Sequence, residues 1–490
     1  MKRLLSISFF LAAALSFAVS CSEDELVPPR PEVDWPAGDG SSDGSGETGD
    51  TEDGGDPSDR PSESPVKDAN AETGNLPAWQ EGYVDIHFIN TATGECVFII
   101  MPDGTQMLVD MASANTRQGD TDVIDGVTEQ MYLPRRPNSS FQPADWINMY
   151  LKRCMAWTKN DRLDYVSITH FHSDHFGARI TGLPDRVPGT DGEDVARTLS
   201  KGGYQKIGAA AVLDENKVTK IIDRGYPDYN YPKPLYSSDF TNTMKNYLNA
   251  CKWHAANSGL IREAFRSGAN DQFVMKYNPS RYRMFEIRNL SANGLMWEGV
   301  GTMTDMKYPE NSELSESDSE YVDSPNENMT STVFKLIYGK FELYCGGDLV
   351  SNSTSNGAWR DAERPLANVT GEVEVMKANH HGSADGNTEY FLQKLDPQAV
   401  IVCNWNAVQP RKSTYERLKA SQADVFTLNL DETYAQKYSD KGASLKATSG
   451  HYCVRVSPEG ETYYIYRLDD TDVSMSMKIV ERFGPYQSRN

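Results

Sequence analysis

The segment that most constrains the fold of this chain is a histidine-rich run, His-Phe-His-Ser-Asp-His, at residues 170–175. The chain of 490 residues has eight histidines, and three of them stand within these six positions. An apolar run at 164–169 precedes them and predicts a short strand. On an extended segment the first two histidines project to the same side, while the aspartate and the third histidine lie at the turn into a following helix. Imidazole and carboxylate groups are usual zinc ligands, so this loop is predicted to serve two neighbouring metal sites.

Three further polar motifs each follow an apolar, strand-like run. The first motif is a single aspartate, the second is Gly-Gly-Asp, and the third is Asn-His-His-Gly-Ser. Apolar spacing typical of helices at 390–395 and 414–423 alternates with the later runs, which indicates a layered α/β architecture. The motifs are Asp110, which ends the run 107–110; residues 346–348, which follow 341–345; and residues 379–383, which follow 373–378.

Together the four motifs resemble those of the metallo-β-lactamase superfamily, whose HxHxDH signature matches residues 170–175 without a gap. The resemblance implies an α/β protein with the four-layer αββα metallo-β-lactamase fold. It also implies that Asp110 orients metal-ligand histidines and that Asp348 bridges two metal ions. The implied cofactor is Zn²⁺, as two ions, with Mn²⁺ as the alternative. The implied metal ligands are His170, His172, Asp174, His175, Asp348, His380 and His381, and the implied catalytic carboxylates are Asp110, Asp174 and Asp348.

Segments outside the histidine run are similar to one subgroup of this superfamily. They are Gly-Glu-Cys-Val-Phe-Ile-Ile at 94–100 with the Pro-Asp-Gly turn that follows, Asn-Met-Thr-Ser-Thr-Val at 328–333, and His-His-Gly-Ser at 380–383. These segments resemble the hydrolase domain of ComEC-type competence proteins. The resemblance covers residues 83–181 and 326–465, in the order of the family.

Three positions depart from the pattern of that subgroup. His172 stands where ComEC-type members commonly carry Asp, and Gln409-Pro410 stands where relatives often have His-Pro. The third superfamily motif, a histidine between the hexad and the bridging aspartate, has only His254 as a candidate. Because a lone histidine on a helix face usually has a packing role, the first metal site is either one ligand short or completed by the middle of the chain or by water.

The chain divides into an N-terminal signal, a linker and a folded domain. Residues 1–20 combine a basic start, an apolar run and small residues before Cys21, and they resemble a bacterial lipoprotein signal peptide. Ordinary secretion, with Cys21 as a spare thiol, is the alternative. Residues 21–75 are expected to be a lipidated cysteine with a disordered acidic linker, and 76–490 the hydrolase domain, with an insertion at 182–328. The expected location is the bacterial cell envelope, facing the periplasm or the cell surface.

The formal net charge of −22 limits the classes of partner. Residues 22–75 contribute 16 acidic and 3 basic side chains to it, and the rest of the chain is moderately acidic. A chain of this charge does not bind nucleic acid by neutralising phosphates over its whole surface. A stable nucleic-acid complex is therefore not expected, although nucleic acid can still be a substrate.

Two adjacent divalent ions lower the pKa of a shared water molecule and polarise the oxygen of the group under attack. The resemblance therefore predicts a metal-dependent hydrolase, acting on a phosphodiester or another phosphorylated small molecule or polymer. One alternative is hydrolysis of amide, lactone or β-lactam bonds, and another is a surface binding lipoprotein with a vestigial metal site. Redox use of the fold, as in di-iron proteins, is disfavoured because those resemble HxExDH and would need Glu where His172 stands.

Overall fold

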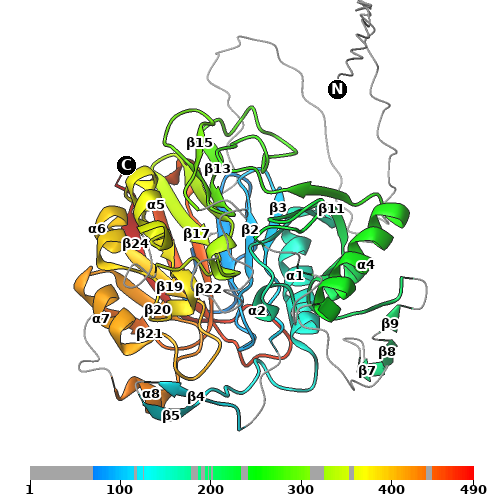
Figure 1. Cartoon of the computed structure of the whole chain (residues 1–490), viewed down its shortest axis with the longest axis horizontal. Helices are drawn as coiled ribbons and strands as arrows, with labels where there is room; N and C mark the ends of the chain where they lie inside the picture. Colours follow the sequence, from blue (N-terminus) through cyan, green and yellow to red (C-terminus); the bar gives the residue numbers. More distant parts are fainter. Residues whose placement is uncertain are drawn as a thin grey trace, which may run out of the picture. The chain divides into compact units, whose positions relative to one another are not determined.

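Two sheets of nine strands each form the centre of the protein (Figure 1). All described residues belong to one compact unit, Pro65–Asn490. The predicted signal peptide 1–20 and most of the predicted linker 21–75 lie outside the described residues. The structure is a computed structural model, and it describes residues 70–114, 119–124, 126–177, 186–188, 194–196, 198–199, 202–232, 235, 241–308, 325–351, 358–437 and 444–489.

The first sheet joins strands from both ends of this unit. In spatial order its strands are β12 (Ile261–Ala264), β11 (Lys217–Asp223), β6 (Arg162–Ile168), β3 (Gln106–Val109), β2 (Val97–Ile100), β1 (Val84–Phe88), β22 (His451–Val456), β23 (Thr462–Leu468) and β24 (Ile479–Gln487). The neighbouring strands β3, β6 and β11 run parallel, so the residues that follow β3 and β6 emerge at the same edge of the sheet. All residues of β6 except the first are buried, because both faces of the sheet are covered.

The second sheet carries the later polar motifs. In spatial order its strands are β15 (Thr304–Met306), β14 (Leu295–Trp297), β13 (Phe285–Ala292), β16 (Val333–Tyr338), β17 (Phe341–Gly346), β18 (Val375–Lys377), β19 (Ala399–Val402), β20 (Asp424–Thr427) and β21 (Leu445–Ala447). The strands from β17 to β21 are parallel, so the segments that follow β17, β18 and β19 also share one edge.

A continuous layer of buried apolar side chains lies between the two sheets. It includes Val84 and Ile99 of the first sheet and Leu336 and Leu343 of the second. Each fully buried side chain of this kind stabilises the fold by about 1.5–3 kcal/mol. The layer therefore fixes how the edges of the two sheets face each other.

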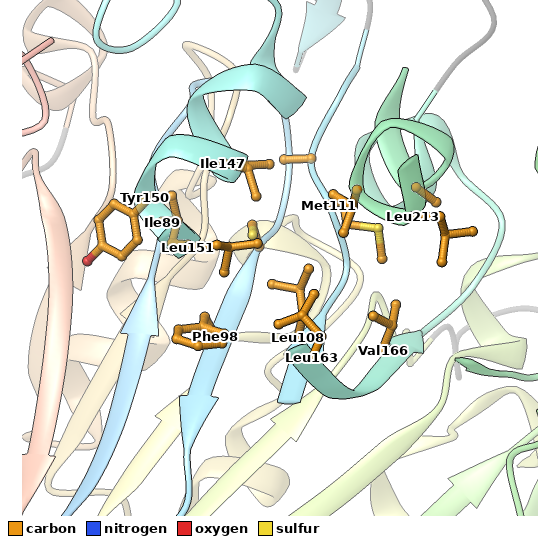
Figure 2. Packing of buried hydrophobic residues seen from close by; sticks show 14 of the residues in the cluster. Ile89, Phe98, Leu108, Met111, Ile147, Tyr150, Leu151, Leu163, Val166 and Leu213 are labelled. Atoms are coloured by element: carbon orange, nitrogen blue, oxygen red, sulfur yellow. The ribbon is translucent and has the colours of Figure 1, made fainter. Parts of the chain in front are cut away.

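Three helices cover the outer face of the first sheet: α1 (Pro143–Thr158), α3 (Gly208–Glu215) and α4 (Thr241–Asn257). Figure 2 shows Ile147 and Leu151 of α1 facing Phe98, Leu108 and Leu163 of the sheet. These helix residues are four positions apart, so they lie on one face of α1. In the sequence, apolar residues over 144–157 have the spacing that predicts a helix, and α1 confirms this prediction.

Three more helices, α5 (Glu363–Thr370), α6 (Glu389–Leu395) and α7 (Lys412–Ala420), cover the outer face of the second sheet. Leu366, Phe391 and Leu418, one from each helix, pack in a cluster with Met376 and Val400 of the sheet. The layers are therefore helix, sheet, sheet and helix. The predicted four-layer αββα architecture is confirmed.

The segment 182–328, predicted as an insertion, contributes to both sheets where it is described. β11 and β12 extend the first sheet, and β13, β14 and β15 extend the second. The other elements are short. They include the helices α2 (Ser173–Phe176) and α8 (Glu432–Ala435) and the 3₁₀ helices η3 (Asn328–Thr330), η4 (Ala358–Arg360), η5 (Asn379–Gly382) and η6 (Pro458–Gly460). Three two-stranded sheets pair β4 (Thr121–Ile124) with β5 (Val127–Gln130), β7 (Arg186–Pro188) with β8 (Asp194–Ala196), and β9 (Thr198–Leu199) with β10 (Tyr204–Gln205). Across the described ranges, no helix has both the length and the apolar composition needed to cross a membrane.

Candidate metal centre

The predicted site residues lie at the edges where the parallel strands end. β3 ends just before Asp110, and β6 ends two residues before His170. In the second sheet, β17 ends two residues before Asp348, and β18 is followed by the turn that contains His380 and His381. Because the sheets pack face to face, side chains more than 200 positions apart in the sequence come into contact.

An inner group of donors surrounds one oxygen of Asp348. The Oδ2 atom of Asp348 lies 3.1 Å from the Nε2 atoms of both His175 and His381. These two Nε2 atoms are 3.2 Å apart, and that of His381 lies 3.0 Å from the Oδ2 atom of Asp174. His175, His381 and Asp348 are at most 1% exposed, and Asp174 is 8% exposed.

An outer group faces the same oxygen from the side of the histidine run. The Nε2 atom of His170 lies 3.0 Å from Nδ1 of His172 and 3.8 Å from Oδ2 of Asp348. The Nε2 atom of His380 lies 3.9 Å from that oxygen. In each of two sets, His170 with His172 and Asp348, and Glu95 with His175, His381 and Asp348, the donor atoms lie within 4.8 Å of one another. Asp348 thus belongs to both sets, as a bridging ligand would.

The hydrogen bonds of the inner histidines make the site suitable for a cation. Nδ1 of His381 donates to the carbonyl oxygen of Cys403 at 2.8 Å, and Nδ1 of His175 donates to Oδ2 of Asp110 at 2.7 Å. In the neutral rings, both Nε2 atoms therefore present lone pairs to each other and to carboxylates. The Oδ1 atom of Asp348 is buried and has no hydrogen-bond partner among the described residues. Converging nitrogen and oxygen acceptors of this kind fit a divalent ion such as Zn²⁺ or Mn²⁺.

The charges of the group support the same conclusion. Burial lowers the pKa of His381, but Asp348 and Asp174 outweigh it and raise this pKa to about 9. Burial likewise opposes the charged form of His175, yet Asp348, Asp110 and Asp174 raise its pKa above the usual value. The pKa of Asp348 is lowered, because the charges of His175 and His381 outweigh its burial. Without a metal, protonated imidazoles therefore balance the charge of the carboxylates, and metal binding would displace those protons from the rings.

Asp110 contacts His175, as the resemblance implies. The backbone of Asp110 is in the left-handed conformation, with φ at 56°. Its Oδ1 accepts from the backbone N–H of Thr169 at 2.8 Å, and its Oδ2 accepts from the Thr169 hydroxyl at 2.6 Å. The carboxylate therefore orients the His175 ring and ties the end of β3 to the end of β6.

Two glycines allow the motifs to approach one another. A Cβ atom on Gly347, next to Asp348, would lie 2.7 Å from side-chain atoms of Thr169. Gly94 has φ at +134°, and a Cβ atom there would lie 2.0 Å from the carbonyl oxygen of Asp174. A larger residue at either position would therefore push the ligand loops apart.

Glu95 and Lys377 form a buried ion pair beside the inner group, and sequence reasoning assigned no role to either. Lys377 Nζ also donates to the carbonyl oxygen of Gly347 at 3.0 Å. Glu95 Oε1 is buried with no hydrogen-bond partner in the described part of the chain. The signal in the sequence was an acidic residue, Glu95, and a basic residue, Lys377, within or beside largely apolar strand-like runs, because buried charges of this kind require a partner.

The adjacent histidines at the end of β18 have different surroundings. Both residues have left-handed φ values, 44° for His380 and 53° for His381, and their ring centroids are 6.1 Å apart. His381 belongs to the inner group, whereas the side chain of His380 is 22% exposed. Nδ1 of His380 bonds to Asp385 at 2.7 Å, and Nε2 lies 3.2 Å from the side-chain nitrogen of Asn328. His380 therefore lies at the rim of the site.

The remaining sequence candidates lie elsewhere or have other partners. His254 is on α4, where Nε2 contacts the Tyr204 hydroxyl at 3.1 Å and Nδ1 contacts Ser258 at 3.3 Å. It belongs to neither donor set. Gln409 accepts hydrogen bonds from the backbone N–H groups of Trp405 and Asn406, so it stabilises the loop after β19. In the described residues, the outer group thus has no third histidine from the middle of the chain.

Comparisons with known proteins give a distant structural likeness. No family model matches the chain, and no curated protein matches it. Among solved structures that match is CmlA, a diiron β-hydroxylase from Streptomyces venezuelae, with 12% sequence identity and a TM-score of 0.32. The match covers 77% of this chain and 55% of that chain, so this chain spans about half the length of CmlA. At this identity and TM-score the likeness identifies neither a metal nor a reaction for this chain.

Proposed function

We propose that the chain is a metal-dependent hydrolase that binds two divalent ions, zinc or manganese, and acts on a phosphodiester or related phosphorylated substrate. The observation that carries the proposal is the position of the Asp348 Oδ2 atom. It lies 3.1 Å from two imidazole nitrogens of the inner group and 3.8 Å from one of the outer group. One carboxylate between two sets of histidines is the arrangement expected of a two-metal hydrolytic site.

Each residue of the site would have a defined task. Asp110 and the carbonyl oxygen of Cys403 fix the rings of His175 and His381 with Nε2 toward the ions. Bound ions would lower the pKa of a water molecule and polarise the substrate oxygen. His380 lies at the exposed rim, where a substrate can reach it. The residues that would hold the ions are Asp174, His175, His381 and Asp348 for the inner one, and His170, His172 and Asp348 for the outer one.

The choice of a phosphodiester rests on the resemblance to ComEC-type hydrolase domains. Two ions that share a bridging carboxylate can stabilise both the attacking and the leaving oxygen of a phosphoryl group. Hydrolysis of an amide, lactone or β-lactam uses the same ions, so the fold alone does not select the substrate.

The experiment compares turnover of bis-nitrophenyl phosphate and of nitrocefin by the full-length protein, with its zinc, manganese and iron content measured. Asp348→Asn removes the shared charge, and Asp305→Asn, at an exposed site with no contact to the donor sets, is the control. We expect phosphodiester turnover in the wild type and in Asp305→Asn but not in Asp348→Asn. Faster turnover of nitrocefin would favour the second substrate class. A metal-free wild type with no turnover would contradict the proposal.

The lipid anchor on Cys21 and a location in the cell envelope are a second part of the proposal, supported by the signal-like sequence of residues 1–20. Replacing Cys21 by Ser should move the protein from the membrane fraction to the soluble fraction. Equal membrane association of both forms would contradict the anchor.

A further inference from the structure

Phe171 lies between the two outer histidines, and its backbone is held by a carboxylate. Its N–H donates to Oε1 of Glu327 at 2.7 Å. Glu327 forms a two-pronged ion pair with Arg224, in which Nε donates to Oε1 at 2.8 Å and Nη2 donates to Oε2. The Arg224 side chain is completely buried, and that of Glu327 is 8% exposed. A buried ion pair therefore adjoins the loop that carries His170 and His172.

Arg224 is itself fixed on its remaining sides. Its Nη1 donates to the carbonyl oxygen of Tyr231 at 2.8 Å and to Oδ1 of Asn293 at 3.3 Å. The guanidinium group also lies over the ring of Phe171, 4.9 Å from the centroid. The pair thus contacts both the backbone and the side chain of Phe171, and it connects the end of β11 to the segment before β16.

The inner group has separate supports. His175 is held by Asp110, and His381 is held by the carbonyl oxygen of Cys403. Neither of these bonds involves Arg224 or Glu327. Glu327 is followed by Asn328, whose side chain contacts His380 at the rim. The contacts of this ion pair are therefore on the outer side of the site.

Stability alone is a weak reason for such a pair. Removing two charges from water costs several kcal/mol per ion, and apolar residues of similar volume are often as stabilising. A planar guanidinium that holds a carboxylate with two bonds also fixes its direction, which an apolar contact does not. Here the Glu327 carboxylate points toward the backbone N–H of Phe171, the one residue between the candidate ligands His170 and His172.

We propose that Arg224 and Glu327 are positioning residues for the outer metal site. They hold residues 170–172 so that the nitrogens of His170 and His172 converge on one divalent cation. The inner site does not depend on them. This inference rests on the proposed two-metal function, and it assigns the two ions different supports.

The test is a titration of metal-free, full-length protein with Zn²⁺ in competition with a chromophoric chelator, which resolves the affinity for each ion. Glu327→Gln keeps the shape of the side chain and removes its charge. We expect the affinity for the more weakly held, outer ion to fall by about 10- to 100-fold, as for other residues that orient metal ligands. The affinity for the inner ion should stay unchanged.

A matched control separates positioning from general stability. Arg455 forms a similar two-pronged pair with Asp85, with both side chains buried and no contact to either Asp348-containing set. Arg224→Lys and Arg455→Lys both replace a planar fork by a point charge. Only Arg224→Lys should weaken the outer ion, and this variant also serves if Glu327→Gln does not fold.

The possible results distinguish this inference from the proposed function. Two ions bound by the wild type, with equal affinities in Glu327→Gln and Arg224→Lys, would overturn the positioning role. Parallel weakening of both ions in these variants, or of the outer ion in Arg455→Lys, would also overturn it. A wild type that binds no zinc would instead overturn the proposed two-metal site.

Discussion

His381 and His451 are both buried imidazoles, and their neighbours determine which protonation state each one favours. Burial opposes the charge of His381, but the carboxylates of Asp348 and Asp174 lie within 3.1 Å of its Nε2 atom and raise its pKa to about 9. His451 accepts a hydrogen bond on Nδ1 from the backbone N–H of Asn90 at 2.9 Å, and burial lowers its pKa to about 4. The first imidazole is therefore placed to receive a cation, and the second serves as a neutral part of the core.

The adjacent residues His380, at the rim, and His381, in the inner group, should differ in their effect on metal binding. His381→Ala removes a buried nitrogen 3.1 Å from the shared Asp348 oxygen, whereas His380→Ala removes a partly exposed nitrogen 3.9 Å away. We expect His381→Ala to weaken binding of the inner ion by more than about 100-fold, because the loss of a ligand should exceed the effect of losing a residue that only orients a ligand. His380→Ala should weaken this binding much less. Zinc titration of both variants measures this. Equal losses would show that the two rings contribute alike.

A second prediction concerns pH and the neutral His451. Its pKa is about 4 in the folded protein and about 6.5 in the unfolded chain, so the unfolded chain binds the proton more readily. Stability from this group is complete above pH 6.5 and decreases as the pH falls toward 4. The pKa difference corresponds to a loss of about 3 kcal/mol.

Urea unfolding at a series of pH values between 7 and 4 measures this loss. His451→Gln, which does not titrate in this range, should show a smaller decrease in unfolding free energy than the wild type. His87 has a similarly lowered pKa of about 4, so part of the decrease should remain in the variant. Identical decreases in both proteins would contradict the assignment.

At the scale of the elements, the site depends on loops that approach each other closely where parallel strands end. Gly94 precedes β2, and the backbone N–H of Glu95 donates to the carbonyl oxygen of Asp174 at 2.9 Å. The first turn of α2 therefore rests against the start of β2. A side chain at position 94 would separate the two segments, since its Cβ atom would overlap the same carbonyl group.

Gly94→Ala should therefore destabilise the fold and weaken metal binding together. Gly259→Ala is the control, because Gly259 also has a positive φ, +71°, but no atom within 4 Å of the added Cβ. We expect Gly259→Ala to cost about 1–2 kcal/mol, the cost of a left-handed conformation alone, and Gly94→Ala to cost more. Denaturant unfolding and zinc titration of both variants test this. Equal costs would mean that the Asp174 loop moves freely out of the way.

The sequence predicts elements well where their apolar pattern is strong. The strands near 164–169 and 341–345 and the helix near 390–395 appear close to their predicted bounds, because most of their residues are buried on a regular face. The strands of the segment 182–328 were not predicted. β12 and β15, for example, are short edge strands with largely exposed or half-exposed side chains, so they lack a clear alternation of apolar residues.

At the scale of the whole molecule, the site exists only because two sheets face each other. The sequence motifs name most of its residues, but they do not show which of His380 and His381 turns inward, since two left-handed residues in the turn decide this. They also do not place His254, which lies on α4 and contacts Tyr204. Glu95, Glu327 and Lys377 were missed because their importance comes from partners distant in the sequence.

The central claim is that Asp348 joins two metal sites. The most direct measurement is the metal content per chain of the full-length protein, by elemental analysis after equilibration with zinc and removal of free metal, for the wild type and for Asp348→Asn. The account predicts two ions per chain in the wild type and the loss of both in the variant, because both donor sets of this centre contain Asp348. A wild type without tightly bound metal, or a variant that keeps both ions, would contradict it.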